Sequence, residues 1–496
     1  MRSYKLYFGW DYYNYSLDVD IEEIIREKFP DFRPTGIYPN DSDTLPLTDS
    51  TYELTNDWHQ LITTLERYNG NVEIIHKDTT ELIQQNIPFI YLIGIKSGPQ
   101  IWGRGDRNKL FYNIKEHTKN YIKSGKVLVI VDMSGEGYPV ENLDELTLSE
   151  TGDIPSTPIA IERACTREDF PFDKVCYLTG NAHAVNFKKS KIKAITMVNS
   201  EIRLKYQTNP NMNPTWTEDK FNEVFEYKKK NYRRPTTKHF LSLCKLVKDW
   251  RLYHSLGLNY YNLHEKGLTS LIIPQNELVV LNEREFIDED VDDFEFNKNI
   301  KDFKEYIRVI QLKLRLIGNT EHGKFIKSND NIQSLLKKIP LYVDLKSFEE
   351  EDGTPISGFT AWNSSFYNDS FFSYLYESYA YNNKTNYVTE KFWKTVLNFH
   401  PTILVTNPYT LRYLKERGYK TFSPYIHEFY DEVEEFDIRS EMLLKEVNRL
   451  CDMRKIELLD WYASQSETLI YNFKKYVIED PIVDAVNEIK KMYKLL

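Results

Sequence analysis

Short apolar runs alternate with amphipathic stretches along the first half of the chain. The runs are bounded by polar and turn residues, as expected of strands that are buried on both faces. Strands are predicted at residues 3–10, 71–76, 87–95, 126–133, 174–180 and 193–198. Apolar residues at i, i+3 and i+4 predict helices at 18–29, 57–68 and 110–125. This alternation predicts a mainly parallel sheet with helices on both faces.

A Lys- and Arg-rich segment, residues 226–238, interrupts the pattern, and we interpret it as a solvated linker. The alternation then resumes. Further strands are predicted at residues 239–246, 268–274, 339–345, 371–378, 400–407 and 419–425. Helices are predicted at 297–318, at 408–418 and over most of the chain from residue 439 onward. The sequence therefore predicts an α/β protein with two halves that join near residue 235.

We expect three parts from this pattern. Residues 1–230 form a first Rossmann-like domain, residues 231–480 a second, and residues 481–496 a C-terminal helix that can cross back to the first. A ligand is expected at the carboxyl ends of the strands, because open parallel sheets bind ligands there.

Composition and charge narrow the class of protein to which this chain can belong. Of the 496 residues, 41% are hydrophobic and 28% charged, which is typical of a globular protein with full cores. The net charge of −10 gives no overall attraction to polyanions, so nucleic acid would need a local basic groove. The four cysteines have no CxxC spacing, and we expect buried, reduced thiols. No signal-peptide core or transmembrane stretch is evident, and we expect a cytoplasmic protein.

The most informative stretch is "NYVTEKFWKTVLNFHPTILVTNP", residues 386–408. Thr389 is positioned to cap a helix whose inward face carries Phe392 and Val396. Glu390 and Lys391 then fall in the first turn. The free N–H groups and the dipole of a helix start favour a phosphate, so the stretch predicts an anion site. The alternative is an ordinary first turn, in which Glu390 complements the dipole and Lys391 is solvated.

This run resembles the nucleotide-sugar signature of the α-1,3-fucosyltransferase family, in which an acid and a serine near a strand end precede an aromatic-hydrophobic-Thr-Glu-Lys segment. The matching residues are Glu377, Ser378, Tyr387, Val388, Thr389, Glu390 and Lys391. The resemblance implies that Glu390 contacts the nucleotide ribose and Lys391 the diphosphate. It also implies a GT-B fold, with two Rossmann-like domains facing each other across a cleft and the donor held mainly by the second.

A looser similarity covers residues 238–271, which resemble the opening strand, basic loop and helix of the donor domain in related glycosyltransferases. In those enzymes the loop and first helical turn supply basic residues to the diphosphate. The available positions here are Arg251, Lys245 and Lys248, of which Arg251 is the first choice.

Glycosyl transfer places negative charge on the departing diphosphate, and a cation must meet it. Asp-x-Asp matches occur at Asp18 to Asp20 and between Asp288 and Asp292, but we interpret them as caps and surface residues, so no metal site is predicted. Lys391 and Arg251 would take the place of the metal, as is usual for GT-B enzymes.

Inversion needs a general base on the acceptor hydroxyl. The predicted strand that ends at Asp132 is followed by Glu136 between two glycines. The fucosyltransferase-like enzymes place a Glu in a comparable loop, which makes Glu136 the candidate base and Asp132 its partner. The alternative is that Asp132 caps a loop and Glu136 lies on the surface.

Acceptor contacts are expected from Asn181, just beyond a strand, and from Trp102 and Arg104. We therefore expect a metal-independent, inverting glycosyltransferase that uses a GDP- or UDP-sugar as co-substrate and binds no other cofactor. A glycan, a lipid-linked sugar or a modified DNA base would suit as acceptor, and the oligomeric state stays open. The alternative is a noncatalytic glycan- or nucleotide-binding protein with the same shell.

Overall fold

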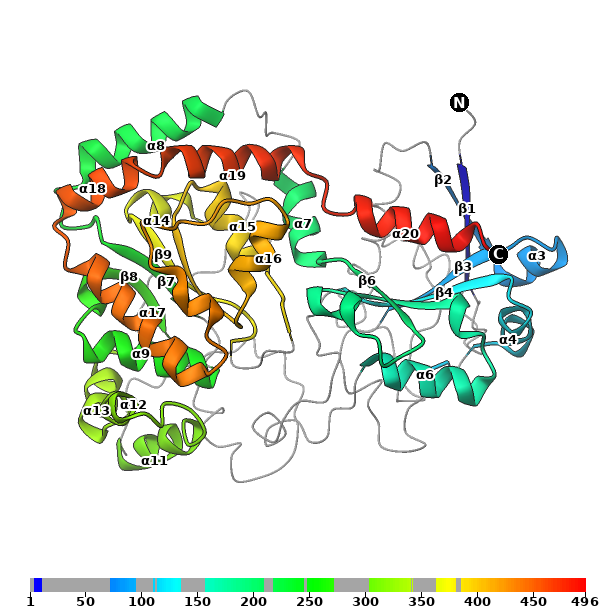
Figure 1. Ribbon diagram of the computed structural model, residues 1–496, viewed down its shortest axis with the longest axis horizontal. Coiled ribbons are helices and arrows are strands. Elements are labelled where there is room, and N and C mark those ends of the chain that lie inside the picture. Colours follow the sequence, from blue (N-terminus) through cyan, green and yellow to red (C-terminus); the bar gives the residue numbers. More distant parts are fainter. Residues whose placement is uncertain are drawn as a thin grey trace, which may run out of the picture. The chain divides into compact units, whose positions relative to one another are not determined.

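The computed structural model describes residues 4–10, 72–94, 110–111, 114–134, 157–208, 217–244, 248–271, 303–339, 341, 363–380 and 385–496 (Figure 1). The chain divides into two compact units. The first contains residues 1–203, 384–387 and 480–496, and the second contains residues 204–383 and 388–479. The expected division at residue 230 differs from this one, because residues 204–230 pack with the second unit.

The first unit contains a six-stranded, wholly parallel sheet with the order β2-β1-β3-β4-β5-β6. Its strands are β1 (Tyr4–Trp10), β2 (Val72–Asp78), β3 (Phe89–Gly94), β4 (Val127–Met133), β5 (Val175–Thr179) and β6 (Lys193–Thr196). All six strands predicted in the first half are confirmed. β4 and β5 are buried along their whole length, as their continuous apolar sequences require.

Helices of the first unit are α3 (Thr79–Gln84), α4 (Glu116–Lys123), α6 (Thr157–Glu168) and α20 (Val483–Tyr493), with the 3-10 turns η3 (Phe172–Lys174) and η4 (Ala182–Asn186). α4 is shorter than the predicted 110–125, because Phe111 adopts a left-handed conformation (φ 71°) that no helix continues. α20, red in Figure 1, packs on β6, and its Tyr493 hydroxyl donates to the Pro88 carbonyl at 2.8 Å. α7 (Asn199–Thr208) spans the division between the units.

The second unit has a four-stranded parallel sheet with the order β10-β9-β7-β8. The strands are β7 (Phe240–Cys244), β8 (Gly267–Leu271), β9 (Phe372–Tyr376) and β10 (Thr402–Val405). The chain leaves β7 toward β8 on one side and leaves β9 toward β10 on the other. The strand order therefore reverses between β7 and β9.

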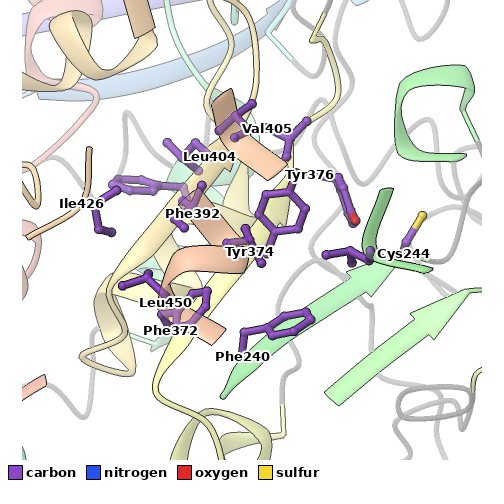
Figure 2. Close-up of a cluster of buried hydrophobic side chains, with 14 of the residues drawn as sticks. Phe240, Cys244, Phe372, Tyr374, Tyr376, Phe392, Leu404, Val405, Ile426 and Leu450 are labelled. Atoms are coloured by element: carbon purple, nitrogen blue, oxygen red, sulfur yellow. The ribbon is translucent and has the colours of Figure 1, made fainter. Parts of the chain in front are cut away.

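Helices surround this sheet. They are α8 (Thr217–Asn231), α9 (Asp249–Tyr260), α11 (Phe303–Lys313), α12 (Glu321–Ile326), α13 (Asn329–Lys338), α14 (Ser364–Asn368), α15 (Glu390–Leu397), α16 (Thr410–Glu416), α17 (Phe436–Cys451), α18 (Lys455–Ala463) and α19 (Ser466–Ile478), with the turns η7 (His264–Lys266) and η8 (Glu428–Glu432). One buried cluster joins strands and helices, and Figure 2 shows Phe240, Tyr374, Leu404 and Phe392 within it, from β7, β9, β10 and α15.

The predicted strand at 419–425 is wrong, because this segment contains turns and no strand. Its backbone pairs with a side chain instead of with a neighbouring strand. The Lys420 N–H donates to Asn472 Oδ1 at 2.9 Å, and Asn472 Nδ2 donates to the Lys420 carbonyl at 2.7 Å. A single amide side chain thus satisfies both backbone groups of Lys420.

The basic segment at 226–238 is not a solvated linker throughout. Its first part continues α8, and Lys228 is completely buried there. The Lys228 ammonium donates to the carbonyls of Tyr367 at 2.6 Å, Asn368 at 3.2 Å and Ser370. Three acceptors match the three donors of an ammonium group, which is how the core accommodates this charge. Burial nevertheless lowers the pKa of Lys228 to about 7.

Several predicted features lie outside the described residues. They are the helices at 18–29 and 57–68, the Asp-x-Asp matches, and the strand at 339–345 apart from a bridge between Leu271 and Leu341. The four cysteines are free and buried, as predicted. In the part of the chain that the structure describes, no helix has the length and apolar character needed to cross a membrane.

Candidate functional site

The reversal of strand order between β7 and β9 is where an open parallel sheet is expected to bind a ligand. The helix after β7 is α9, and the helix after β9 is α15. Both run back along the sheet, so both begin near the carboxyl ends of these two strands. We call the residues that meet here the strand-switch site; they are Lys248, Arg251, Glu377, Ser378, Thr389, Glu390 and Lys391.

Arg251 lies in the first turn of α9 and is buried. Its Nη2 donates to the backbone carbonyl of Glu377 at 3.2 Å. This bond joins the helix after β7 to the residue that follows β9. The guanidinium is therefore held at the switch point.

Glu377 is engaged through its backbone and its side chain, and it is fully buried. Its N–H donates to the Val405 carbonyl at 3.0 Å, which extends the pairing of β9 with β10. Its carboxylate accepts the Thr389 N–H at 3.1 Å and the Thr389 hydroxyl at 2.7 Å. Burial raises the pKa of Glu377, while the nearby Lys391 charge and the bonds from Thr389 lower it in part. Glu377 thus fixes the start of α15 on the end of β9.

Thr389 is the N-cap of α15, as predicted from the sequence. Its hydroxyl accepts the Lys391 N–H at 3.4 Å and the Lys391 ammonium at 3.0 Å. A hydroxyl has one donor and two acceptor positions, and Glu377 and Lys391 use all of them.

Glu390 and Lys391 occupy the first turn of α15 but differ in exposure. The Glu390 side chain is 7% exposed and the Lys391 side chain 31% exposed, with Nζ of Lys391 at 3.4 Å from Oε1 of Glu390. The Lys391 ammonium therefore combines partial access to solvent with a fixed position. An anion can approach it without the helix unfolding.

Lys248, the residue before α9, adds another cation at the same edge. Its Nζ donates to the Ser378 carbonyl at 3.1 Å. The same ammonium lies 5.1 Å from the ring centroid of Trp250 and 5.5 Å from that of Tyr379. Sequence reasoning gave no role to these two aromatic residues, although each directly adjoins a predicted site segment.

Asp132 is the next-to-last residue of β4 in the first unit and is buried. Its Oδ1 accepts the N–H of Ser134 at 2.9 Å and the Ser134 hydroxyl at 2.6 Å. These bonds are those of a loop cap, which is the alternative that the sequence left open. Its expected partner Glu136 lies outside the described residues, as do Trp102, Arg104 and Lys245.

Asn181 is completely buried and caps η4. Its Oδ1 accepts the His183 N–H at 3.0 Å and the Asn386 N–H at 2.9 Å. The Asn386 carbonyl in turn accepts the Ala182 N–H at 2.8 Å. Tyr387, also buried, follows directly. The structure thus places Asn181 against the segment that precedes α15, where it bonds to protein backbone.

Among the described residues, no group of three or more His, Cys, Asp and Glu side chains is arranged to hold a metal ion. Comparison of the chain with protein-family models, with curated proteins and with solved structures found no match.

Proposed function

We propose that this chain is a glycosyltransferase that moves a sugar from a nucleotide-sugar donor to an acceptor hydroxyl, and that the strand-switch site binds the donor diphosphate. The single observation that carries the proposal is the position of Arg251 and Lys391. They lie in the first turns of the two helices that follow the strands on either side of the reversal. The resemblance of the Thr-Glu-Lys segment to a nucleotide-sugar signature supports the same assignment.

The chemistry suits a diphosphate. The leaving group gains negative charge as the bond to the sugar breaks, and fixed cations lower the energy of that state more than mobile ones. Arg251 and Lys391 are held by hydrogen bonds to protein groups, and Lys248 lies nearby. In this proposal these cations receive the diphosphate, Glu390 contacts the ribose, and the donor is a GDP- or UDP-sugar.

The finer features rest on the resemblance. In the proposed reaction the two units adopt the GT-B arrangement, configuration is inverted, and Glu136 removes the proton of the acceptor hydroxyl. Asp132 then orients the loop that carries Glu136, since its carboxylate caps the first residues after β4. The acceptor class is a glycan, a lipid-linked sugar or a modified DNA base.

Donor turnover tests the proposal. The protein is incubated with GDP-, UDP-, CMP- and dTDP-sugars, and released nucleotide is measured for wild type, Lys391→Ala and Glu136→Gln. The expected result is release of nucleotide from one donor by wild type, binding weakened about tenfold or more in Lys391→Ala, and loss of turnover with binding kept in Glu136→Gln. Binding without turnover under every acceptor condition would favour a noncatalytic binding protein instead.

A further inference from the structure

The segment that precedes α15 belongs to a different compact unit from the helix itself. Residues 384–387 are part of the first unit, while residues on both sides of them are part of the second. The chain thus leaves the second unit after β9, contributes four residues to the first, and returns to begin α15.

Asn181 holds this segment. Its side-chain oxygen accepts the Asn386 N–H at 2.9 Å, and the next residue, Ala182, donates its N–H to the Asn386 carbonyl at 2.8 Å. Thr385, Asn386 and Tyr387 are all buried. Both backbone groups of Asn386 are therefore fixed by η4 and its cap.

Only Tyr387 and Val388 separate Asn386 from Thr389, the N-cap of α15. The three steps of extended chain from Asn386 to Thr389 span at most about 10 Å, which leaves little freedom between the two anchors. The anchor at one end is Asn181, and the anchor at the other is Glu377, which bonds to Thr389.

We propose that Asn181 is a positioning residue for the strand-switch site, acting through Asn386 to fix where α15 begins. The functional part of this inference rests on the proposed donor binding. In this role Asn181 does not touch the donor. It limits local opening of the first turn of α15, which carries Glu390 and Lys391.

Variants with different side-chain lengths at residue 181 can separate two roles of Asn181, which are its hydrogen bond with Asn386 and its capping of η4. Asn181→Ser retains a hydroxyl that can cap the His183 N–H but is too short to reach Asn386 as well. Asn181→Asp keeps an oxygen at the position of Oδ1 and is the conservative variant. Asn181→Ala removes both bonds.

Hydrogen exchange of the full chain tests the inference without any ligand. We expect the backbone amides of Asn386 and of residues 389–392 to exchange about tenfold faster in Asn181→Ser and Asn181→Ala, because one buried hydrogen bond is lost. Amides of β4 and β9 should be unchanged, and Asn181→Asp should restore slow exchange at residues 389–392. Faster exchange that stops at Asn386 and leaves residues 389–392 unchanged would overturn the proposal. Should Asn181→Ala fail to fold, Asn181→Ser alone decides between these outcomes.

Donor binding provides the second measurement. With the nucleotide sugar that wild type binds, Asn181→Ser should raise Kd about threefold to tenfold, and Asn181→Asp should restore it in part. An unchanged Kd with faster exchange in α15 would overturn the link to the strand-switch site. Absence of wild-type binding to any donor would refute the proposed function. The exchange experiment would still decide whether Asn181 limits opening of the first turn of α15.

Discussion

The carboxylate of Glu377 accepts both the backbone N–H and the hydroxyl of Thr389, at 3.1 and 2.7 Å. The residue that follows β9 is thereby bonded to the residue that caps α15, twelve positions later in the chain. The resemblance gave both residues a place in donor binding. Their contacts with each other give them a structural task as well, which is to hold the start of α15 in place.

Thr389→Ala should destabilise the second unit by about 2 kcal/mol, because the helix loses its cap and the buried Glu377 carboxylate loses a donor. Thr389→Ser keeps the hydroxyl and should lie within about 0.5 kcal/mol of wild type. Urea unfolding of wild type, Thr389→Ala and Thr389→Ser measures these differences in unfolding free energy. Equal midpoints for Ala and wild type would show that the Glu377–Thr389 contact contributes little.

Lys228→Met should cost about 3 kcal/mol, since the carbonyls of Tyr367, Asn368 and Ser370 lose their donor inside the core. Lys229→Met is the matched control, because Lys229 is exposed on the same helix. It should change the unfolding free energy by less than about 0.5 kcal/mol. Similar effects of the two substitutions would mean that Lys228 is solvated in solution.

His264 should make the second unit sensitive to acid. Its Nε2 donates to the Ser255 carbonyl at 3.1 Å, and burial lowers its pKa to about 4. A histidine in the unfolded chain has a pKa near 6.5 and takes up a proton first as the pH falls. The contribution of neutral His264 to the free energy of unfolding is therefore complete above about pH 6.5 and is lost as the pH falls toward about 4.

The change that isolates this effect is His264→Asn. Between pH 7 and pH 5, the unfolding free energy of wild type should fall by about 2 kcal/mol more than that of the variant. Urea titrations at the two pH values give the difference. Parallel pH dependences for the two proteins would contradict a buried, neutral His264.

Phe399 follows the C-cap of α15 in a left-handed conformation (φ 50°), where glycine is the usual residue. Its ring stacks on Phe473 at 4.6 Å between centroids and lies edge-on to Phe221 at 5.7 Å. Phe399→Gly should relieve about 1 kcal/mol of backbone strain but lose about 3–5 kcal/mol of packing, for a net loss of about 2–4 kcal/mol. Phe399→Leu, which keeps part of the apolar volume, should lose less packing. Thermal unfolding would contradict this account if the Gly variant were as stable as wild type.

The sequence predicted most strands because their apolar runs are continuous and bounded by turns. It failed at 419–425, where Asn472 satisfies the backbone from more than fifty residues away. It also missed the burial of Lys228, since a lysine beside other lysines resembles a solvated face. The carbonyls that accept hydrogen bonds from Lys228 come from residues 367–370, far along the chain.

For the candidate site, too, the sequence predicted the features set by neighbouring residues and missed the contacts between residues far apart in the chain. Local sequence located Thr389 as a helix cap and Lys391 in the first turn, because capping depends on neighbouring residues. The bond between Arg251 and the Glu377 carbonyl could not be predicted, since it depends on β7 and β9 being neighbours in the sheet. The contact of Asn181 with Asn386 joins residues more than two hundred positions apart and has no local signal.

Isothermal titration of wild type and Lys391→Ala with the four nucleotide sugars tests the central claim most directly, with Lys445→Ala as an exposed lysine control in the same unit. We predict that wild type binds one donor, that Lys391→Ala raises Kd about tenfold to a hundredfold, as loss of a charged hydrogen bond requires, and that Lys445→Ala leaves Kd unchanged. Equal Kd values for Lys391→Ala and wild type, or no binding of any donor by wild type, would contradict a diphosphate site at the start of α15.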